Sequence, residues 1–301
     1  MARGAACFPD LVSGWLGLPI ESLVRSSTFV YAVHKKSMMN TIELGEAYAA
    51  IGGCIAPYFT DGEYFGIETP HVVTEIDPLG YGDAVAATFM THEIALEPRG
   101  LATAMRQAVL EHPHVTFRGS ERVTEVDATR RTITTTVATL EPFDHVVNCA
   151  WQGRPSIDRT AGIAVPRGVH RMKYFMRSPA GSVEPGRPST TVVLGGFGDV
   201  VVYGDGSVFL SWYPVGRRGI STDITPPVWP DRLDAGEAAR VGRAMLDGLG
   251  DVVPDAADLA RDWSVDGGYI YAVGQSDIDD TESLLHARDR SGVASFGSYH
   301  S

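Results

Sequence analysis

The sequence predicts an α/β protein that contains an α+β part. Helical and strand-like segments alternate as far as His112, and short strands then follow one another up to Ala150. After Gly153 comes a second block, in which strands surround a single clear helix. The 301 residues, 44% of them hydrophobic, are enough for a large core in one big or two moderate domains.

Hydrophobic periodicity and residue type define the expected elements in order. Helical patterns cover residues 5–18, 37–58, 98–112 and 234–249. Strands are predicted where β-branched and aromatic residues gather, at 27–34, 87–96, 115–118, 123–126, 132–139, 144–150, 171–176, 268–273 and 293–296. The segment DVVVYGDGSVFLSWYP is predicted to fold as a hairpin about Gly204-Asp205-Gly206. The stretches 178–189 and 225–230, rich in proline and glycine, are predicted to be surface loops.

One strand end raises a question of function. The segment DHVVNCAWQGR, residues 144–154, passes from apolar residues to small ones and then places Trp151 beside Gln152 and Gly153. In an open α/β sheet, ligands bind beyond the carboxyl ends of strands, where small side chains let the backbone come close. An ordinary core strand that ends in a turn has the same pattern, because short apolar runs are ambiguous.

Charge and cysteine content restrict the partners and the compartment. The formal net charge of −12 argues against a nucleic-acid backbone or an anionic membrane as the main partner. Cys7, Cys54 and Cys149 are odd in number and widely spaced, which favours a reducing cytoplasm. The start MARGAACFPDLVSGWLG lacks the apolar stretch of a signal peptide. No apolar run approaches the roughly 18 residues of a membrane span.

Motif searches predict no metal site and assign no catalytic residue. GGFGDV, residues 195–200, lacks the G-x-G-x-x-G spacing and leads into a strand, so it is predicted to be a turn. The histidines are dispersed without ligand spacing, and a structural role is expected for each. The acidic run 277–282 lacks the glycine and the ligand period of a calcium loop, and is predicted to be solvated.

An ordered series of elements does carry a resemblance. EPRGLATAMRQAVLEHPHVTFRGSERVTEVD, residues 97–127, reads as a helix, a strand and a Val-x-x-Val element, and DHVVNCAWQG follows a small antiparallel piece. This series resembles the middle of FAD-dependent oxidoreductases of the D-amino-acid oxidase and glycine oxidase type. The resemblance covers nearly the whole chain. It implies an incomplete FAD-binding oxidoreductase-like layer, interleaved with a mainly antiparallel substrate-domain sheet.

The same resemblance implies a division of the chain and a set of cofactor contacts. Residues 1-26, 97-165 and 275-301 correspond to a partial FAD-binding domain, and 27-96 and 166-274 to a substrate domain. In the family, a valine beyond the helix and strand lies against the adenine, and a later strand end lies beside the flavin. The terminal GVASFGSYHS resembles the return strand and turn that approach the flavin. The matching positions are Val123, Ala150, Trp151, Gly153, Gly297, Ser298, Tyr299 and His300.

Aromatic residues of the substrate-domain strands are the candidates for lining a substrate cavity. Each of them has core packing as its alternative role, because strand aromatics usually pack. The candidates are Tyr31, Tyr174, Tyr203, Trp212 and Tyr271.

Two departures from the family qualify the expected function. The family opens with a strand, G-x-G-x-x-G and a helix that bind the FAD pyrophosphate, and it continues beyond the position of Ser301. We therefore expect a truncated gene model, a fragment or a remnant. The family also clamps an amino-acid carboxylate with an arginine, whereas RDWSVDGGYIYA places Arg261 too early and Asp266-Gly267 near the expected position. An amino-acid substrate is thus one option among several.

The resemblance implies an FAD-dependent oxidoreductase-like protein that transfers hydride from a small amine, amino acid or alcohol to flavin. The alternative is a non-catalytic truncated remnant that cannot hold FAD. FAD binding is expected to be impaired, because backbone N–H groups at a helix N-terminus normally meet the pyrophosphate. A missing strand is also expected to leave an apolar sheet edge beside Val146 and Val147, which favours poor solubility.

Overall fold

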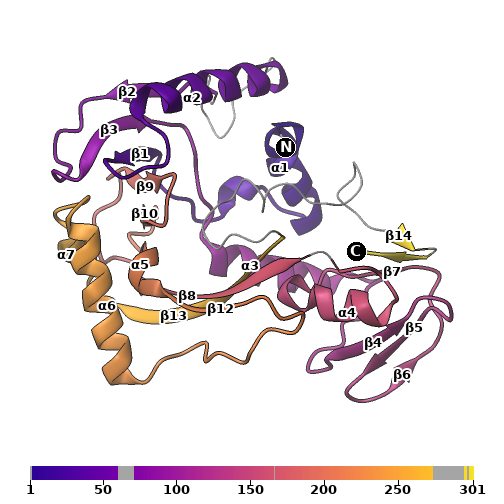
Figure 1. Cartoon of the computed structure of the whole chain (residues 1–301). Helices are drawn as coiled ribbons and strands as arrows, with labels where there is room; N and C mark the ends of the chain where they lie inside the picture. The colour runs from indigo at the N-terminus through magenta and orange to yellow at the C-terminus, as the bar shows by residue number, and fades with distance from the viewer. Residues whose placement is uncertain (1, 60–70, 166, 274–294, 297) are drawn as a thin grey trace. The chain divides into compact units, whose positions relative to one another are not determined.

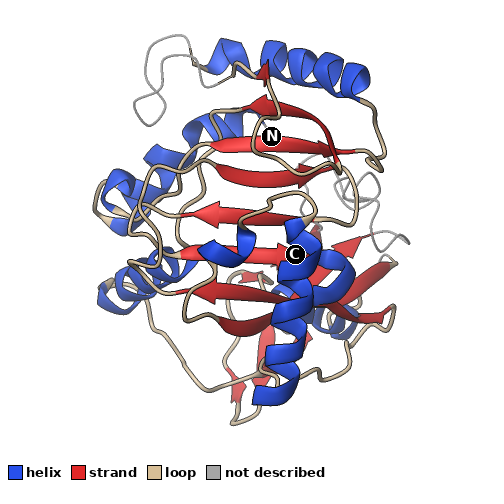
Figure 2. Ribbon diagram, turned by 90° about the vertical axis from the view of Figure 1, so that its left-hand side faces the viewer, coloured by secondary structure: helices blue, strands red, loops and turns tan. Residues whose placement is uncertain are grey.

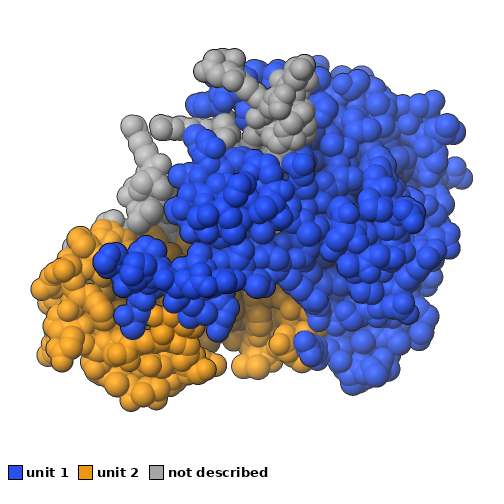
Figure 3. All heavy atoms as spheres, turned by 180° about the vertical axis from the view of Figure 1, so that it is seen from behind, with its two compact units in different colours: residues 1–116, 175–216, 232–266 blue, residues 117–174, 217–231, 267–301 orange. Residues whose placement is uncertain are grey.

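The computed structural model describes residues 2–59, 71–165, 167–273, 295–296 and 298–301 (Figure 1). The chain divides into two compact units (Figure 3). Unit 1 comprises residues 1–116, 175–216 and 232–266, and unit 2 comprises residues 117–174, 217–231 and 267–301. Among the described residues, no helix is long and apolar enough to cross a membrane.

Unit 1 is built on a mixed, mainly antiparallel sheet. Its strands run in the order β8-β11-β10-β9-β1-β3-β2, with β8 contributing its last residues. Strands β1 and β9 pair in parallel, and the other neighbours in this order pair antiparallel. The bounds are β1 (Phe29–His34), β2 (Thr74–Ile76), β3 (Val85–Met90), β8 (Gly168–Ser178), β9 (Ser189–Val193), β10 (Gly198–Val202) and β11 (Val208–Trp212).

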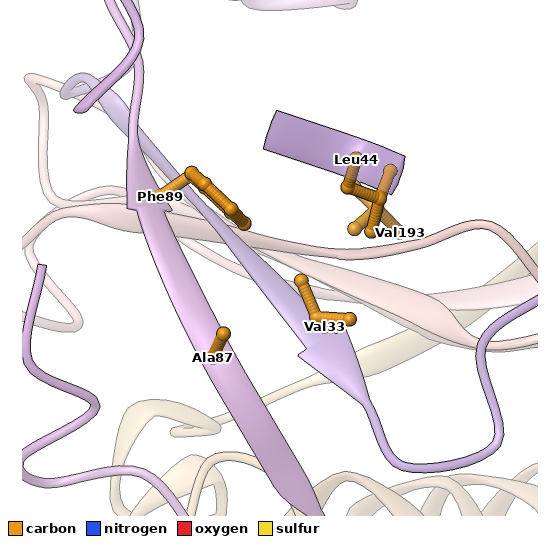
Figure 4. Close-up of a cluster of buried hydrophobic side chains, with 5 residues drawn as sticks. All are labelled: Val33, Leu44, Ala87, Phe89 and Val193. Carbon is orange, nitrogen blue, oxygen red and sulfur yellow. The ribbon is translucent and has the colours of Figure 1, made fainter. Parts of the chain in front are cut away.

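Helix α2 (Thr41–Ile55) packs on the β1 and β3 end of this sheet. It begins where the sequence allows a complete cap: the Asn40 side chain accepts the Glu43 N–H, and the Glu43 side chain accepts the Asn40 N–H. Leu44 of this helix belongs to one buried cluster with Val33 and Phe89, and in Figure 4 it lies beside Val193 of the same cluster. Burial of these side chains stabilises the contact by about 1.5–3 kcal/mol for each large apolar residue.

Helix α6 (Ala235–Gly250) crosses the strands on the β11 side of the sheet (Figure 2). Asp234 caps its first turn by accepting the Glu237 N–H, and Val241, Met245 and Leu249 form its fully buried stripe. The remaining helices of unit 1 are α1 (Ala2–Leu16), η1 (Ile20–Ser22), η2 (Ala56–Tyr58), α3 (Pro98–Glu111), α5 (Tyr213–Gly216) and α7 (Ala256–Leu259).

Unit 2 contains two small sheets and the first part of β8. One sheet is the antiparallel set β4 (Val123–Asp127), β5 (Thr132–Thr135) and β6 (Thr139–Leu140). The other is β14 (Ser295–Phe296), β15 (Tyr299–His300) and β7 (Val146–Val147), in which β15 and β7 are parallel. Helices η3 (Trp151–Gly153) and α4 (Arg154–Thr160) follow β7. Strands β12 (Arg217–Ser221) and β13 (Ser264–Val273) pair with β8.

Glycines make room for aromatic rings in both units. In unit 1, a Cβ at Gly242 would lie 2.4 Å from the Trp263 ring, and one at Gly248 would lie 2.2 Å from Trp212. In unit 2, a Cβ at Gly168 would lie 2.5 Å from the Tyr271 ring. Real Cβ contacts do not approach this closely, so each ring occupies the space that a side chain would need.

The structure differs from the sequence-based element predictions in several places, of which three bear on the site or on the central sheet. Residues 115–118 form no strand, and Val115 and Phe117 are about half exposed, because no described strand pairs with them. The strand predicted at 144–150 is limited to β7, because the Asn148 side chain accepts the Ala150 N–H and draws the backbone into a turn. Strand β9 was not predicted, although its sequence STTVV is rich in β-branched residues.

Candidate functional site

A cavity of about 650 Å³ lies entirely within unit 2. Its walls come from β4, from the segment that runs through β7 and η3 into α4, and from the loop after β12. The apolar lining consists of Val123, Val126, Ile133, Val146, Val147, Ala150, Ile157, Pro226, Pro227 and Val228. Polar groups of Arg122, Asn148, Ser156 and Tyr269 stand among them. A mainly apolar cavity with a few fixed polar groups is the usual form of a ligand site.

Side-chain hydrogen bonds hold the loop that forms one wall of this cavity. The Tyr269 hydroxyl donates to the Pro227 carbonyl at 3.0 Å and accepts the Trp229 N–H at 2.8 Å. The Ser156 and Thr225 hydroxyls are 2.8 Å apart, which joins α4 to the same loop. The wall is therefore fixed at both ends by contacts inside unit 2.

The floor of the cavity rests on a buried polar network. The Asn148 amide donates to the Asp158 carboxylate at 3.0 Å and to the Tyr299 hydroxyl at 2.8 Å. The Tyr299 hydroxyl donates to the same Asp158 oxygen at 2.7 Å. Asp158 is 0% exposed and Tyr299 is 1% exposed, so the network holds a carboxylate away from water. Such a network is stable only when its members are hydrogen-bonded, and these bonds fix the register of β15 beside β7.

The protonation state of Tyr299 follows from this environment. Burial, followed by the hydrogen bond to the Asp158 carboxylate, raises the pKa of Tyr299 well above its usual value. The phenol therefore remains protonated at neutral pH and serves as a permanent donor to Asp158.

The residues predicted to contact a cofactor are only partly brought together. Val123, Ala150, Gly153 and Tyr299 all line the unit 2 cavity. Trp151 is not part of the lining: it is 60% exposed, has φ of 48° and donates its indole N–H to the Tyr269 carbonyl at 3.2 Å. The carbonyl of Ser298 accepts the Val146 N–H at 2.9 Å. Gly297 lies outside the described residues.

The imidazole of His300 also lies apart from the cavity lining. Its Nε2 is 3.2 Å from Nδ1 of His145, so the two rings face each other across the parallel pair β7 and β15. This contact was not predicted from sequence, because it depends on which residues the two strands place side by side.

The five aromatic candidates for a substrate cavity fall into different places. Tyr31 packs against a cluster of Phe29, Val201 and Tyr203 in unit 1, and its hydroxyl donates to the Glu93 carboxylate. Trp212 is buried against Gly248 of α6.

The other two candidates lie in unit 2. Tyr174 is buried and donates to the Pro230 carbonyl at 2.6 Å. Tyr271 lies with its ring centroid 4.8 Å from that of His170. Of the five, Tyr31 and Tyr203 alone are brought together in one described cluster.

The chemistry of the cavity fits one part of FAD better than another. Its aliphatic walls suit a flat, apolar ring such as adenine, which can also accept hydrogen bonds at its edge. A pyrophosphate requires N–H donors or cations, and Arg122 is the only arginine or lysine among the described lining residues. The residues present therefore fit the adenine end of the dinucleotide, and offer one charged group toward the phosphates.

No protein-family model and no curated protein matches the chain. Solved structures do share its arrangement. Glycine oxidase from Geobacillus kaustophilus matches with a TM-score of 0.58 at 12% identity, over 90% of this chain and 66% of that one. Iminodiacetate oxidase from Chelativorans sp. BNC1 matches with a TM-score of 0.58 at 14% identity, over 91% and 68%. The chain has the glycine oxidase fold.

L-proline dehydrogenase from P. horikoshii shares the glycine oxidase fold, with a TM-score of 0.56 at 11% identity, over 99% of this chain and 71% of its own. The chain thus spans about two thirds of the length of these proteins. The predicted recognition, the FAD-dependent oxidoreductases of the D-amino-acid oxidase and glycine oxidase type, is confirmed as a fold. The predicted mixed α/β architecture with a mainly antiparallel sheet is confirmed as well.

Proposed function

We propose that this protein is an FAD-dependent oxidoreductase-like protein whose unit 2 cavity receives the adenine end of FAD. The observation that supports it is the convergence of Val123 with Ala150 and Gly153 on one cavity, although Val123 lies 27 positions before Ala150 in the sequence. The resemblance assigned Val123 to the adenine, and Ala150 and Gly153 to the strand end beside the flavin. The glycine oxidase fold of the chain adds to this support.

The chain's own residues would bind and orient the cofactor. The aliphatic walls would enclose the adenine, and the Asn148–Asp158–Tyr299 network would keep the cavity floor rigid. Arg122 would meet a phosphate. When bound, FAD supplies hydride acceptance from a C–H bond beside a small amine, amino acid or alcohol. The cofactor domain 1-26, 97-165 and 275-301, and the substrate domain 27-96 and 166-274, are part of this proposal.

A second candidate is a non-catalytic protein that keeps the fold without holding FAD. The single arginine of the described cavity lining favours it, because a pyrophosphate bound without several charge-assisted hydrogen bonds loses about 1.5–3 kcal/mol for each one. We therefore propose that FAD binding by this chain is weak. A calorimetric FAD titration that gave submicromolar affinity would contradict the weak binding.

The cavity assignment is tested by calorimetric titration with FAD, ADP and FMN. Saturable binding of FAD and ADP, without binding of FMN, is expected, because FMN lacks the adenine end. In the variant Val147→Trp, the indole would fill the cavity from an exposed strand position and remove ADP binding. Val137→Trp is the matched control, since Val137 is 70% exposed and lies outside the lining. Absence of ADP and FAD binding in the unaltered protein would favour the second candidate.

A further inference from the structure

A second cavity, of about 470 Å³, lies entirely within unit 1. Its floor is the sheet itself, at Val30 of β1 and Met90 of β3, which are partners across the two strands. Its walls come from the loop after β2, from the residues just before β9 and from the residues just before α7. The volume falls within the roughly 300–1,000 Å³ of sites for small organic ligands.

This cavity lies on the face of the sheet opposite to α2. Val33 of β1 and Phe89 of β3 share a buried cluster with Leu44 of α2 (Figure 4). Because successive residues of a strand point to opposite faces, Val30 and Met90 point away from that helix. Tyr31, a candidate for the substrate cavity, packs against the α2 cluster, so it belongs to the other face. The cavity is thus separate from that side of the sheet and from the cavity of unit 2.

Contacts inside unit 1 hold the walls of this cavity in place. The hydroxyls of Tyr81 and Thr190 are 3.0 Å apart, which joins the loop after β2 to β9. The N–H of Gly82, the next residue of that loop, donates to the Val252 carbonyl at 3.0 Å. A Cβ at Gly82 would lie 2.2 Å from the carbonyl oxygen of Asp251, so only glycine permits this approach. The cavity is therefore formed before any ligand arrives.

Most of the cavity lining is apolar. It consists of Val30, Ile76, Leu79, Met90, Pro188 and Pro254. Leu79 belongs to this lining although it is 88% exposed, so it stands at the open side of the cavity. A ligand that covered this side chain would remove apolar surface from water, which favours binding.

The charged groups of the lining leave one negative charge uncompensated. Arg187 and Asp255 form a bidentate ion pair, with Nη2 of Arg187 2.6 Å from Oδ1 of Asp255 and Nη1 bonded to Oδ2. The hydrogen bond to Arg187 is the main cause that lowers the pKa of Asp255, so the pair stays charged and contributes no net charge. Burial raises the pKa of Tyr81, so its phenol stays neutral.

Asp77 carries the remaining charge. Its Oδ1 accepts the Leu79 N–H at 3.1 Å, and its Oδ2 has no partner among the residues that the structure describes. No arginine or lysine of the described chain forms an ion pair with it. A carboxylate oxygen is thus available beside an apolar cavity.

We propose that this cavity binds an organic cation with one or two apolar rings, the rings against the aliphatic lining and the cationic group toward Asp77. N–H groups of a cation form charge-assisted hydrogen bonds with a carboxylate, and these are about twice as strong as neutral ones. The formal net charge of −12 on the chain attracts such a ligand from a distance.

The test uses the full chain without FAD, so its outcome is independent of the proposed function. Benzamidinium, benzamide and benzoate are titrated separately by calorimetry, because these three planar molecules are alike in size and differ in charge. Benzamidinium is expected to bind saturably and at least about tenfold more tightly than benzamide, and benzoate is expected not to bind. Absence of saturable benzamidinium binding, or benzoate binding of equal affinity, would overturn the proposal.

Substitutions in the exposed loop locate the binding in this cavity. Asp77→Asn keeps a side-chain oxygen for the Leu79 N–H and removes the charge, so benzamidinium should bind about tenfold more weakly and benzamide equally well. Asp83→Asn is the matched control, since Asp83 is exposed and lies outside the lining. Leu79→Ala should weaken both ligands, because it removes an apolar contact that the two share. If Asp77→Asn and Asp83→Asn weakened benzamidinium equally, the attraction would be unspecific and the proposal would fail.

Discussion

The phenol of Tyr299 donates a hydrogen bond of 2.7 Å to the carboxylate of Asp158, a residue 141 positions earlier in the chain. Neither side chain has appreciable contact with solvent. The bond joins β15 to α4 inside unit 2, beside the cavity proposed for the cofactor. The stability of unit 2 should therefore depend on this single hydroxyl.

Replacing Tyr299 with Phe removes the donor and leaves the ring in place. The buried Asp158 carboxylate would lose one of its hydrogen bonds, and the free energy of unfolding should fall by about 1–3 kcal/mol. Tyr81→Phe is the control, because it breaks only a hydroxyl–hydroxyl bond to Thr190. Urea unfolding followed by circular dichroism measures both. Equal losses in the two variants would contradict the role of Asp158.

The stability of the protein should fall when the pH drops below about 6.5. Burial is the main cause that lowers the pKa of His170. Three weaker effects raise this pKa and offset the burial only in part: hydrogen bonds to the backbone of Ile224 and of Asp223, and the negative charge of Asp223. At pH 6 the unfolded chain therefore protonates this histidine more readily than the folded chain does, so the free energy of unfolding decreases as the pH falls. Urea midpoints at pH 7.5 and 5.5 should differ less in His170→Gln than in the unaltered protein. His112→Gln, at an exposed position, should keep the full difference.

A second loss of stability is expected above pH 10. Burial raises the pKa of both Tyr48 and Tyr203 to about 12. Their stabilising contribution is fully present below the unfolded value of 10 and is lost as the pH rises toward 12, because the unfolded tyrosines release protons first. Thermal unfolding at pH 9, 10 and 11 should show a steep decline. The decline should be shallower in Tyr203→Phe, and an unchanged slope would contradict the assignment.

Two adjacent glycines of α2 should respond to alanine in opposite ways. A Cβ at Gly53 meets nothing within 4 Å, so Gly53→Ala should raise stability by about 0.5–1 kcal/mol through helix propensity. A Cβ at Gly52 would lie 2.7 Å from the carbonyl oxygen of His71, so Gly52→Ala should cost about 1–3 kcal/mol. Thermal denaturation of the two variants checks the difference. A stabilising Gly52→Ala would show that His71 does not lie against this helix.

Arg122 should contribute the salt-dependent part of FAD binding. Arg122→Gln is expected to weaken FAD affinity about tenfold, by loss of one charge-assisted bond of about 1.5 kcal/mol. The salt dependence of the affinity should decrease at the same time. Arg130→Gln is the control, since its side chain is 81% exposed and lies outside the cavity lining. FAD affinity is measured by titration at 50 and 300 mM salt for both variants. If the affinity depends on salt equally in the two variants, Arg122 does not belong to the FAD site.

Local signals in the sequence predicted the helices well and some strands poorly. The proline at the start of α3 marks a real helix start, because such signals are decided by neighbouring residues. Helix α2 was predicted from residue 37 but begins at Thr41, after a cap at Asn40 that the prediction did not use. Strand β9 and the failed strand at 115–118 show the opposite case. A strand forms only when another strand pairs with it, and that partner is set by the tertiary fold.

The candidate site shows the same limit. Val123, Ala150 and Gly153 were found through the resemblance, and they share a cavity. Asn148 and Tyr269 were missed as site residues, because their roles depend on partners more than 100 positions away or on a distant loop.

The glycines that face aromatic rings constrain how this sequence can change. In each of three pairs, the aromatic ring occupies the space that a side chain on the glycine would need, so neither residue can change alone. The pairs are Gly168 with Tyr271, Gly242 with Trp263, and Gly248 with Trp212. An alanine at one of these glycines would demand a smaller side chain at its partner in the same lineage. Relatives of this protein should therefore show correlated substitution at these three pairs, and the correlation would identify them even where overall identity has fallen too low for alignment by sequence.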